Sequence, residues 1–316
     1  MTLKNIKREC NMKNWLRKIA VVLFGFGQMA NASDIPNFAE TEQEAKQGNA
    51  ASQFNLGLMY YLGKGAPKDY KQAEHWFRRA AEQGDVDAQT NLGGLYYQGK
   101  GVAQDYEQAK YWFQKAAAQG FAKAQYDLGI IYFFGKGIEQ DYDQAARWYE
   151  KAAEQGYLDA QYNLAIMYDN GFGVSKDRSK AVKWYRKAAE QGDNQAQYTL
   201  ATRYMHGVGI QKNFKQAVQW LRRAADQENI KAQLDLGVAY HNGFGVRQDE
   251  KQALYWYRKA AEQGSSEAQY NLGVMYHYGQ GVHQNQSVAK EWFGKACHNG
   301  SQQGCDAYQK LDQTGY

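Results

Sequence analysis

The sequence predicts an all-α protein, a superhelical solenoid of seven helix-turn-helix repeats of 36 residues. Three residue patterns recur with that period and without an insertion. Gln occurs at 53, 89, 125, 161, 197, 233 and 269, Trp at 76, 112, 148, 184, 220, 256 and 292, and Gly-x-Gly pairs begin at 63, 99, 135, 171, 207, 243 and 279. Because the three series share one phase, we expect seven stacked units of equal length. They span 49–84, 85–120, 121–156, 157–192, 193–228, 229–264 and 265–300.

Each repeat is expected to contain two helices joined by a tight turn. In the second repeat, apolar residues recur at every fourth position from Ala88 to Tyr96, which is the spacing of one helical face. The Gly-x-Gly pair that follows suits the positive-φ backbone at the end of a helix. Asp105 is a good N-cap for the second helix, and a second apolar stripe surrounds Trp112.

Incomplete units flank the seven repeats. Gly48 lies 36 residues before Gly84, so residues 33–48 are expected to form an N-terminal capping helix. Residues 301–316 repeat only the first-helix phase and are expected to form a C-terminal capping helix. Such caps cover the apolar surface of the end repeats, and capped ends favour a monomer.

Residues 1–32 have the features of a secretory signal peptide. Basic residues at 13, 17 and 18 precede an apolar stretch at 19–26, and either Met1 or Met12 could be the true start. The segment Ala30-Asn31-Ala32 predicts cleavage between Ala32 and Ser33. An uncleaved anchor is the alternative, but the apolar stretch is too short to span a bilayer. We therefore expect a periplasmic or secreted protein without membrane insertion after cleavage.

The charge and the motifs argue against several function classes. The net charge of +5 arises within residues 1–32, and the remaining chain has 32 basic and 32 acidic residues. A clustered positive field, on which nucleic-acid binding depends, is therefore not expected. The sequence has no H-E-x-x-H motif and no Walker A loop, and its Gly-x-Gly pairs follow helices rather than strands. We predict no metal, no cofactor and no nucleic-acid partner.

Two cysteines remain after the predicted cleavage, Cys297 and Cys305. An even number of cysteines in an oxidising compartment favours a disulfide. Cys297 occupies the phase of Ala261 and Cys305 the phase of Gln269, so the bond would join the last repeat to the terminal helix. A redox-active pair is the alternative, but its cysteines usually lie three positions apart rather than eight.

The repeat pattern A-Q-x-N-L-G-x-x-Y-x-x-G-x-G-V through W-Y-x-K-A-A-E-Q-G resembles the Sel1-like repeat family, a relative of the tetratricopeptide repeats. It is clear at 52–84, 160–192 and 268–300 and extends over about 250 residues. The resemblance implies a right-handed superhelix with the first helices on its concave side. It also implies adaptor work with a protein or peptide partner, in the envelope or at a host. The ending Lys-Ala-Cys-(x)7-Cys resembles cysteine-rich secreted members, which implies the same disulfide.

Positions that vary on the first helices are the candidate contacts with a partner. The repeat 193–228 departs most from the pattern, with Ala201 for Gly, Leu221 for an aromatic residue and Glu228 for the closing Gly. It is either a specialised segment of the groove or a drifted repeat with a looser turn at Glu228. The predicted contacts are Tyr162, Asp169, Asn170, Arg203, His206, His241 and His277.

The three predicted histidines fall at adjacent phases of successive repeats, which raises the alternative of a metal or pH-sensitive patch. We interpret them as polar residues near helix ends, where a histidine also suits the helix dipole.

An enzyme acting on β-lactams or cell-wall fragments is the alternative function. Ser287-Val288-Ala289-Lys290 matches S-x-x-K, and some cysteine-rich members of the resembled family have been linked to β-lactams. No S-D-N or K-T-G motif accompanies it, and the segment lies in the ordinary second-helix phase. No nucleophile with a base in reach is evident. The sequence therefore predicts a binding scaffold and not an enzyme.

Overall fold

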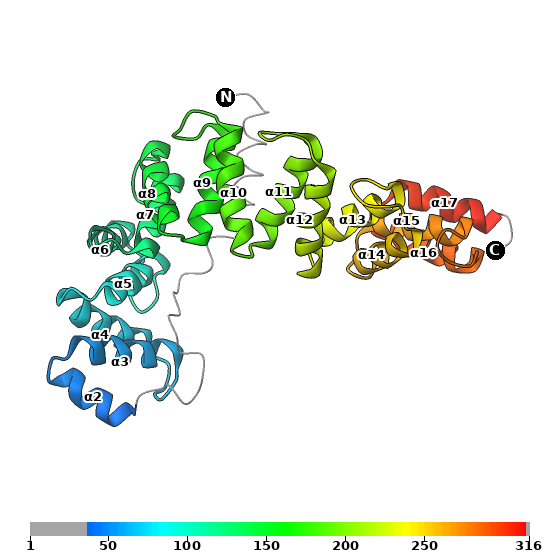
Figure 1. Ribbon diagram of the computed structural model, residues 1–316. Helices are drawn as coiled ribbons and strands as arrows, with labels where there is room; N and C mark the ends of the chain where they lie inside the picture. The colour runs from blue at the N-terminus through cyan, green and yellow to red at the C-terminus, as the bar shows by residue number, and fades with distance from the viewer. Residues whose placement is uncertain (1–36, 314–316) are drawn as a thin grey trace. The chain divides into compact units, whose positions relative to one another are not determined.

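The computed structural model describes residues 37–313, and the predicted signal peptide with its cleavage site lies outside this range. Within it all regular structure is helical (Figure 1). The helices are α2 (Phe38–Lys46), α3 (Ala50–Leu62), α4 (Tyr70–Glu82), α5 (Val86–Gln98), α6 (Tyr106–Ala118), α7 (Ala122–Phe134), α8 (Tyr142–Glu154), α9 (Leu158–Asn170), α10 (Arg178–Glu190), α11 (Asn194–His206), α12 (Phe214–Asp226), α13 (Ile230–Asn242), α14 (Glu250–Glu262), α15 (Ser266–Tyr278), α16 (Gln286–His298) and α17 (Gln302–Gln313). The predicted all-α solenoid of seven repeats is confirmed.

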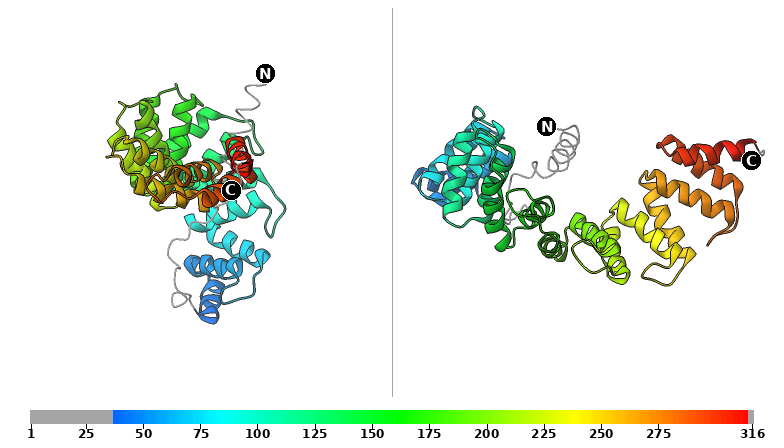
Figure 2. Two further views of the ribbon diagram at one scale, coloured as in Figure 1. Left: turned by 90° about the vertical axis from the view of Figure 1, so that its right-hand side faces the viewer. Right: turned by 90° about the horizontal axis from the view of Figure 1, so that it is seen from above.

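The described chain divides into two compact units, residues 37–176 and residues 177–313. In the first unit the successive pairs from α2·α3 to α8·α9 pack against each other, and in the second unit those from α10·α11 to α16·α17 do so. Figure 2 shows these neighbouring helices as antiparallel pairs from two further sides. None of the helices described between residues 37 and 313 is long and apolar enough to cross a membrane.

The helix ends follow from a few side chains. Every second helix begins after an Asp or Asn that accepts hydrogen bonds from the first turn. Asp105, for example, accepts from the backbone N–H groups of Glu107 and Gln108, each at 3.0 Å. Every first helix ends at a Gly in the left-handed region, such as Gly99 with φ 68°. A residue with a side chain would be strained at that position.

The second glycine of each pair has a different role. Gly101 also has a positive φ, and a Cβ atom on it would clash with the Tyr70 carbonyl oxygen of the preceding repeat. Gly245 meets the Phe214 carbonyl in the same way. This glycine therefore allows the turn of one repeat to approach the backbone of its neighbour closely.

A glycine on each of several first helices accommodates an aromatic ring from the second helix. A Cβ atom at Gly93 would lie 2.8 Å from the ring of Phe113. In the repeat 193–228 this pair is Ala201 and Leu221, and both side chains are fully buried. The added methyl group is thus accompanied by the loss of the ring, and we interpret the two departures as compensated drift. The loss is not obligatory, because the repeat 157–192 buries Ala165 together with Tyr185 at the same two phases.

The buried glutamine series links three helices at each repeat junction. Gln233 in α13 donates through Nε2 to the Ala225 carbonyl oxygen at the end of α12, at 3.1 Å. Its Oε1 accepts from Gln263 Nε2, which follows α14, at 2.8 Å. Gln89 makes the corresponding contacts in the first unit, with Ala81 and Gln119. Buried amides of this kind are retained because both of their polar ends are satisfied.

Glu228 forms the turn between α12 and α13 in the conformation that the equivalent glycines adopt. Its φ is 62°, and it is the non-glycine residue with a positive φ in the described chain. The expectation of a looser turn here is wrong, because Glu228 N still donates to the Ala225 carbonyl oxygen at 3.0 Å. A side chain in this conformation costs about 1 kcal/mol.

The last repeat is closed by α17. A disulfide joins Cys297 in α16 to Cys305 in α17, with their Cα atoms 4.4 Å apart. Leu311 of α17 is buried against Phe293 and Ala289 of α16. The terminal helix therefore covers the apolar end of the stack and is crosslinked to it.

Candidate partner-binding surface

A series of short polar side chains follows the first helices, two residues after each buried Gln. We call it the polar ladder: Asn55, Asn91, Asp127, Asn163, Thr199, Asp235 and Asn271. Amides predominate, and a carboxylate stands at one position in each unit, Asp127 in the first and Asp235 in the second. These two carboxylates are the places where the ladder carries charge.

Side chains from three successive first helices converge on Asp235. The Tyr198 hydroxyl on α11 donates a hydrogen bond to this carboxylate, and Glu267 on α15 lies close enough to repel it. Burial raises the pKa of Asp235, whereas the Tyr198 hydrogen bond, His206 and Lys231 act to lower it. We call these five residues the Asp235 cluster. It combines a hydroxyl, an imidazole, an ammonium group and two carboxylates on one surface.

The corresponding position of the first unit is occupied by an ion pair. Lys123 Nζ lies 3.2 Å from Asp127 Oδ2, and the two side chains are 9% and 2% exposed. Burial raises the pKa of Asp127, and the Lys123 ammonium opposes that shift. The other carboxylate oxygen, Oδ1, has no hydrogen-bond partner among the described residues. Lys123 and Asp127 therefore neutralise each other's charge inside the protein. The residues of the Asp235 cluster are partly or fully exposed to solvent instead.

The residues predicted as contacts in the first unit lie around α9. Tyr162 is buried, with 6% of its surface exposed. Asp169 and Asn170 lie in the last turn of the helix, where Asn170 is exposed and donates through Nδ2 to the Ile166 carbonyl oxygen at 2.8 Å. Of the three, Asp169 and Asn170 have surface available to a partner.

Two of the predicted contacts in the second unit lie on α11. The guanidinium carbon of Arg203 is 5.7 Å from the ring centre of Tyr185, so the charge lies over an aromatic face. His206 is exposed at the end of the helix and belongs to the Asp235 cluster. The structure therefore brings one predicted residue into the cluster.

The other two histidines have partners within their own repeats. His241 Nδ1 lies 2.9 Å from Glu250 Oε2, and His277 Nδ1 lies 2.5 Å from Gln286 Oε1. Each histidine thereby links the end of a first helix to the start of the following second helix. Between residues 37 and 313, no three His, Cys, Asp or Glu side chains are grouped to hold a metal ion.

The sequence interpretation missed Tyr198, Lys231, Asp235 and Glu267. A signal for the cluster was present, because Asp235 replaces the Asn that most other repeats carry at that phase. The interactions of Glu267 and Tyr198 with it depend on how neighbouring first helices are offset, which the repeat pattern alone does not specify.

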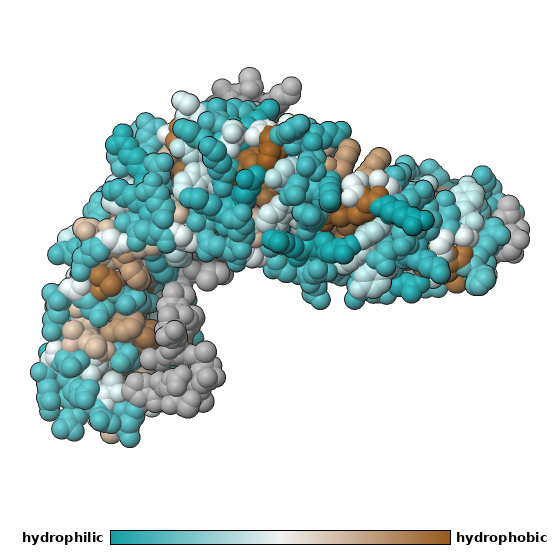
Figure 3. All heavy atoms as spheres, in the orientation of Figure 1, coloured by the Kyte–Doolittle hydropathy of each residue, from teal (hydrophilic) through white to brown (hydrophobic). Residues whose placement is uncertain are grey.

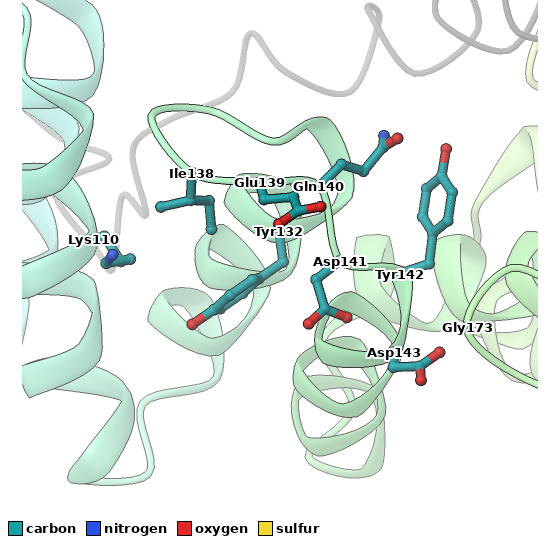
Figure 4. Close-up of a pocket in the computed structure, with 9 residues that line it drawn as sticks. All are labelled: Lys110, Tyr132, Ile138, Glu139, Gln140, Asp141, Tyr142, Asp143 and Gly173. Carbon is teal, nitrogen blue, oxygen red and sulfur yellow. The ribbon is translucent and has the colours of Figure 1, made fainter.

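Surface cavities recur beside the turns. One of about 580 Å³ is lined by Lys110, Tyr132, residues 138–143 and Gly173 (Figure 4). Another of about 700 Å³ lies three repeats later, at Tyr240, residues 246–252 and Gly281. Since both occupy the same repeat phase, they are products of the stacking geometry.

The apolar surface and the S-x-x-K segment can be located among residues 37–313. On the face shown in Figure 3, apolar residues form separate patches within a largely hydrophilic surface. The S-x-x-K segment lies inside α16, and Lys290 Nζ pairs with Asp312 Oδ1 of α17 at 2.7 Å. That lysine therefore contributes to closing the end of the stack.

Comparisons with known proteins agree with this architecture. The family model described as Sel1 repeat matches seven consecutive segments, 50–85, 86–121, 122–157, 158–193, 194–229, 230–265 and 266–301. A comparison with curated proteins finds no match.

Two solved structures are similar over most of the chain. One is a protective antigen of uropathogenic Escherichia coli strains that displays an SLR fold, with 35% identity and a TM-score of 0.81 over 89% of this chain. The chain spans 65% of the length of that antigen. The other is a Sel1 repeat protein from Oxalobacter formigenes, with 36% identity and a TM-score of 0.68 over 88% of this chain and 80% of that one. Seven matched repeats and two relatives of this similarity establish that the chain belongs to the Sel1 repeat family.

Proposed function

We propose that this protein is an exported scaffold that binds a protein or peptide partner through the first-helix surface of its second unit. Sel1 repeat proteins are generally protein-interaction scaffolds, and their solenoids are typically non-enzymatic. The observation that carries the proposal is the Asp235 cluster, in which α11, α13 and α15 direct polar groups to one place.

The polar ladder suits the backbone of an extended peptide. An Asn side chain both donates and accepts hydrogen bonds, as a peptide group does. Asn271 continues the ladder beside Asp235, one repeat further along the chain. A peptide lying across these helices would satisfy its own N–H and C=O groups there. The carboxylates of Asp235 and Glu267 would favour a segment that carries a positive group.

The export of the protein is part of the proposal. A signal peptide is expected over residues 1–32, and the Cys297–Cys305 disulfide suits an oxidising compartment. The similar Escherichia coli protein is described as a protective antigen. These observations support a periplasmic or secreted protein with a partner in the envelope or in a host.

Affinity capture tests the binding surface. Protein purified after expression of the full chain is immobilised, oxidised, and exposed separately to envelope extract and host-cell extract. The variants are Tyr198→Phe with Asp235→Ala, and Arg203→Ala with His241→Ala. The matched control is Asn55→Ala, which alters the same ladder position in the first unit.

We expect a protein that the parent and the control retain and that the Tyr198/Asp235 variant loses. Retention by all of the variants would contradict the role of this surface. Loss from the Arg203/His241 variant as well would extend the contact along α11 and α13. Fractionation of cells that express the full chain checks the proposed export.

A further inference from the structure

A third cavity lies in the second unit, between α12 and α14, on the surface that the second helices form. Its volume is about 360 Å³. The side chains that give it its chemistry are Asp226, Glu228, Tyr255, Trp256, Lys259 and Glu262. It shares no residue with the Asp235 cluster, so it is a separate candidate site.

The cavity has an aromatic wall. Tyr255 is 50% exposed, much as Tyr111 is at the same repeat phase in the first unit. Trp256 stands edge-on to it, with ring centres 4.9 Å apart, and is itself almost fully buried. The open ring face of Tyr255 is a surface on which a planar or cationic group can stack.

Three carboxylates border this wall: those of Asp226, Glu228 and Glu262. None of them forms an ion pair with another residue in the described part of the chain. Lys259 is the single cation on the lining, so the formal charge there is −2. The Lys259 ammonium lies 5.9 Å from the ring centre of Tyr255, which places a cation on this ring already.

Glu228 distinguishes this cavity from the equivalent places in the other repeats. The equivalent turns are closed by glycines such as Gly192 and Gly264, which adopt a positive φ without strain. At Glu228 a carboxylate is retained in the strained conformation, at the edge of the cavity that Tyr255 and Trp256 line. The substitution of glycine by Glu228 thus introduces backbone strain and at the same time adds a negative charge to this cavity.

We propose that this cavity binds the guanidinium group of an arginine side chain on a protein partner. A guanidinium is planar and stacks on an aromatic ring, and its N–H groups form paired hydrogen bonds with carboxylates. Tyr255 supplies the ring, while Glu228 and Glu262 supply the acceptors. The bound arginine displaces the Lys259 ammonium from the ring, and the local charge falls towards zero.

The test uses the protein purified after expression of the full chain, and N-acetyl-arginine methylamide as the probe. The Trp256 indole N–H signal, assigned with Trp256→Phe, reports on the cavity in two-dimensional NMR. We expect a saturable shift with a dissociation constant of about 1 mM, as for a single side chain. The neutral citrulline analogue should produce no such shift, and the lysine analogue a weaker one.

Three variants sharpen the test. Glu228→Gly should weaken the probe about tenfold, because one charge-assisted hydrogen-bonding group is lost. The same change should raise the unfolding temperature, since it removes the strained turn. Lys259→Gln should tighten binding about threefold by removing the competing cation. The control is Glu82→Gln in the first unit, which has the repeat phase of Glu262 and should bind as the parent does.

The proposal is overturned if the probe produces no saturable shift or if the citrulline analogue binds equally well. Equal binding by the lysine analogue would overturn the guanidinium assignment. Unchanged binding by Glu228→Gly would remove Glu228 from the site. None of these results would affect the first-helix surface, whose test uses different residues.

Discussion

The compensated pair in the repeat 193–228 makes a quantitative prediction. In the neighbouring repeat 229–264, a Cβ atom at Gly237 would lie 2.5 Å from the ring of Tyr257, far inside van der Waals contact. Ala201 already has that methyl group, and its partner Leu221 has no ring. Leu221→Phe should therefore press a ring against the Ala201 methyl group. Overpacking of this kind costs about 1–3 kcal/mol. We expect the lower end of that range, because the repeat 157–192 buries Ala165 together with Tyr185 at the same two phases.

The double variant Ala201→Gly with Leu221→Phe recreates the glycine–aromatic pair found in five of the other six repeats, the exception being Ala165 with Tyr185. Ala201→Gly alone should cost about 1 kcal/mol, because glycine weakens a helix interior. The double variant should then be more stable than the sum of the single effects by about 1–3 kcal/mol. Gly237→Ala is the mirror control, and it should destabilise the next repeat by overpacking.

The assay is urea unfolding followed by circular dichroism, with hydrogen exchange of the α11 backbone amides as a local measure. The local measure is needed because repeat arrays do not always unfold in one step. If the two substitutions add within about 0.5 kcal/mol, the pair is not coupled and the compensation argument fails. An unchanged stability of Leu221→Phe would refute it equally.

Three further predictions follow from the same contacts. Gln233→Met should cost about 1–3 kcal/mol in urea unfolding, because it removes two buried hydrogen bonds, the one that Gln233 donates to the Ala225 carbonyl and the one that it accepts from Gln263. Ala substitution of the exposed Gln263 removes only the second of these bonds and should cost about 1 kcal/mol or less, and equal costs would contradict this reasoning. Because burial raises the pKa of Asp235, the folded state binds this proton more tightly than the unfolded state does, so stability falls as pH rises from about 4 through the folded pKa. Asp235→Asn should remove that part of the pH dependence of the unfolding temperature, and an unchanged pH profile would argue against the shift. Reduction of the Cys297–Cys305 disulfide should cost about 2–3 kcal/mol, with increased hydrogen exchange confined to α16 and α17; a uniform increase along the second unit would show that the bond does not act locally.

The architecture was predictable because each repeat presents the same local signals. Asp105 and its equivalents begin the second helices, and glycines such as Gly99 end the first ones, as the pattern indicates. The reason for the second glycine was not predictable. Gly101 is required by the approach of the Tyr70 carbonyl from another repeat, and a one-dimensional pattern contains no such distance.

The candidate site was predictable only in part. His206 was identified by its departure from the pattern and does lie beside Asp235. His241 and His277 depart from the pattern too, yet each is engaged by the start of the next helix in its own repeat. Variation between repeats therefore identifies residues that are free to change, and the structure is needed to separate surface contacts from local partners.

Departures from the repeat fall into two physical classes, and the difference bears on function. Ala201 and Leu221 change together and leave a filled core, so they need no selective explanation. Glu228 and Asp235 are different, because each places a charged group where the other repeats have a glycine or mostly a neutral amide. Glu228 carries backbone strain, and Asp235 is a desolvated carboxylate whose charge Tyr198, His206 and Lys231 stabilise only in part. A stacked array tolerates such local costs because every repeat is stabilised by its neighbours. Glu228 lies in the turn after α12 and borders the second-helix cavity, whereas Asp235 lies on the first helix α13, so the two charges belong to two separate candidate sites.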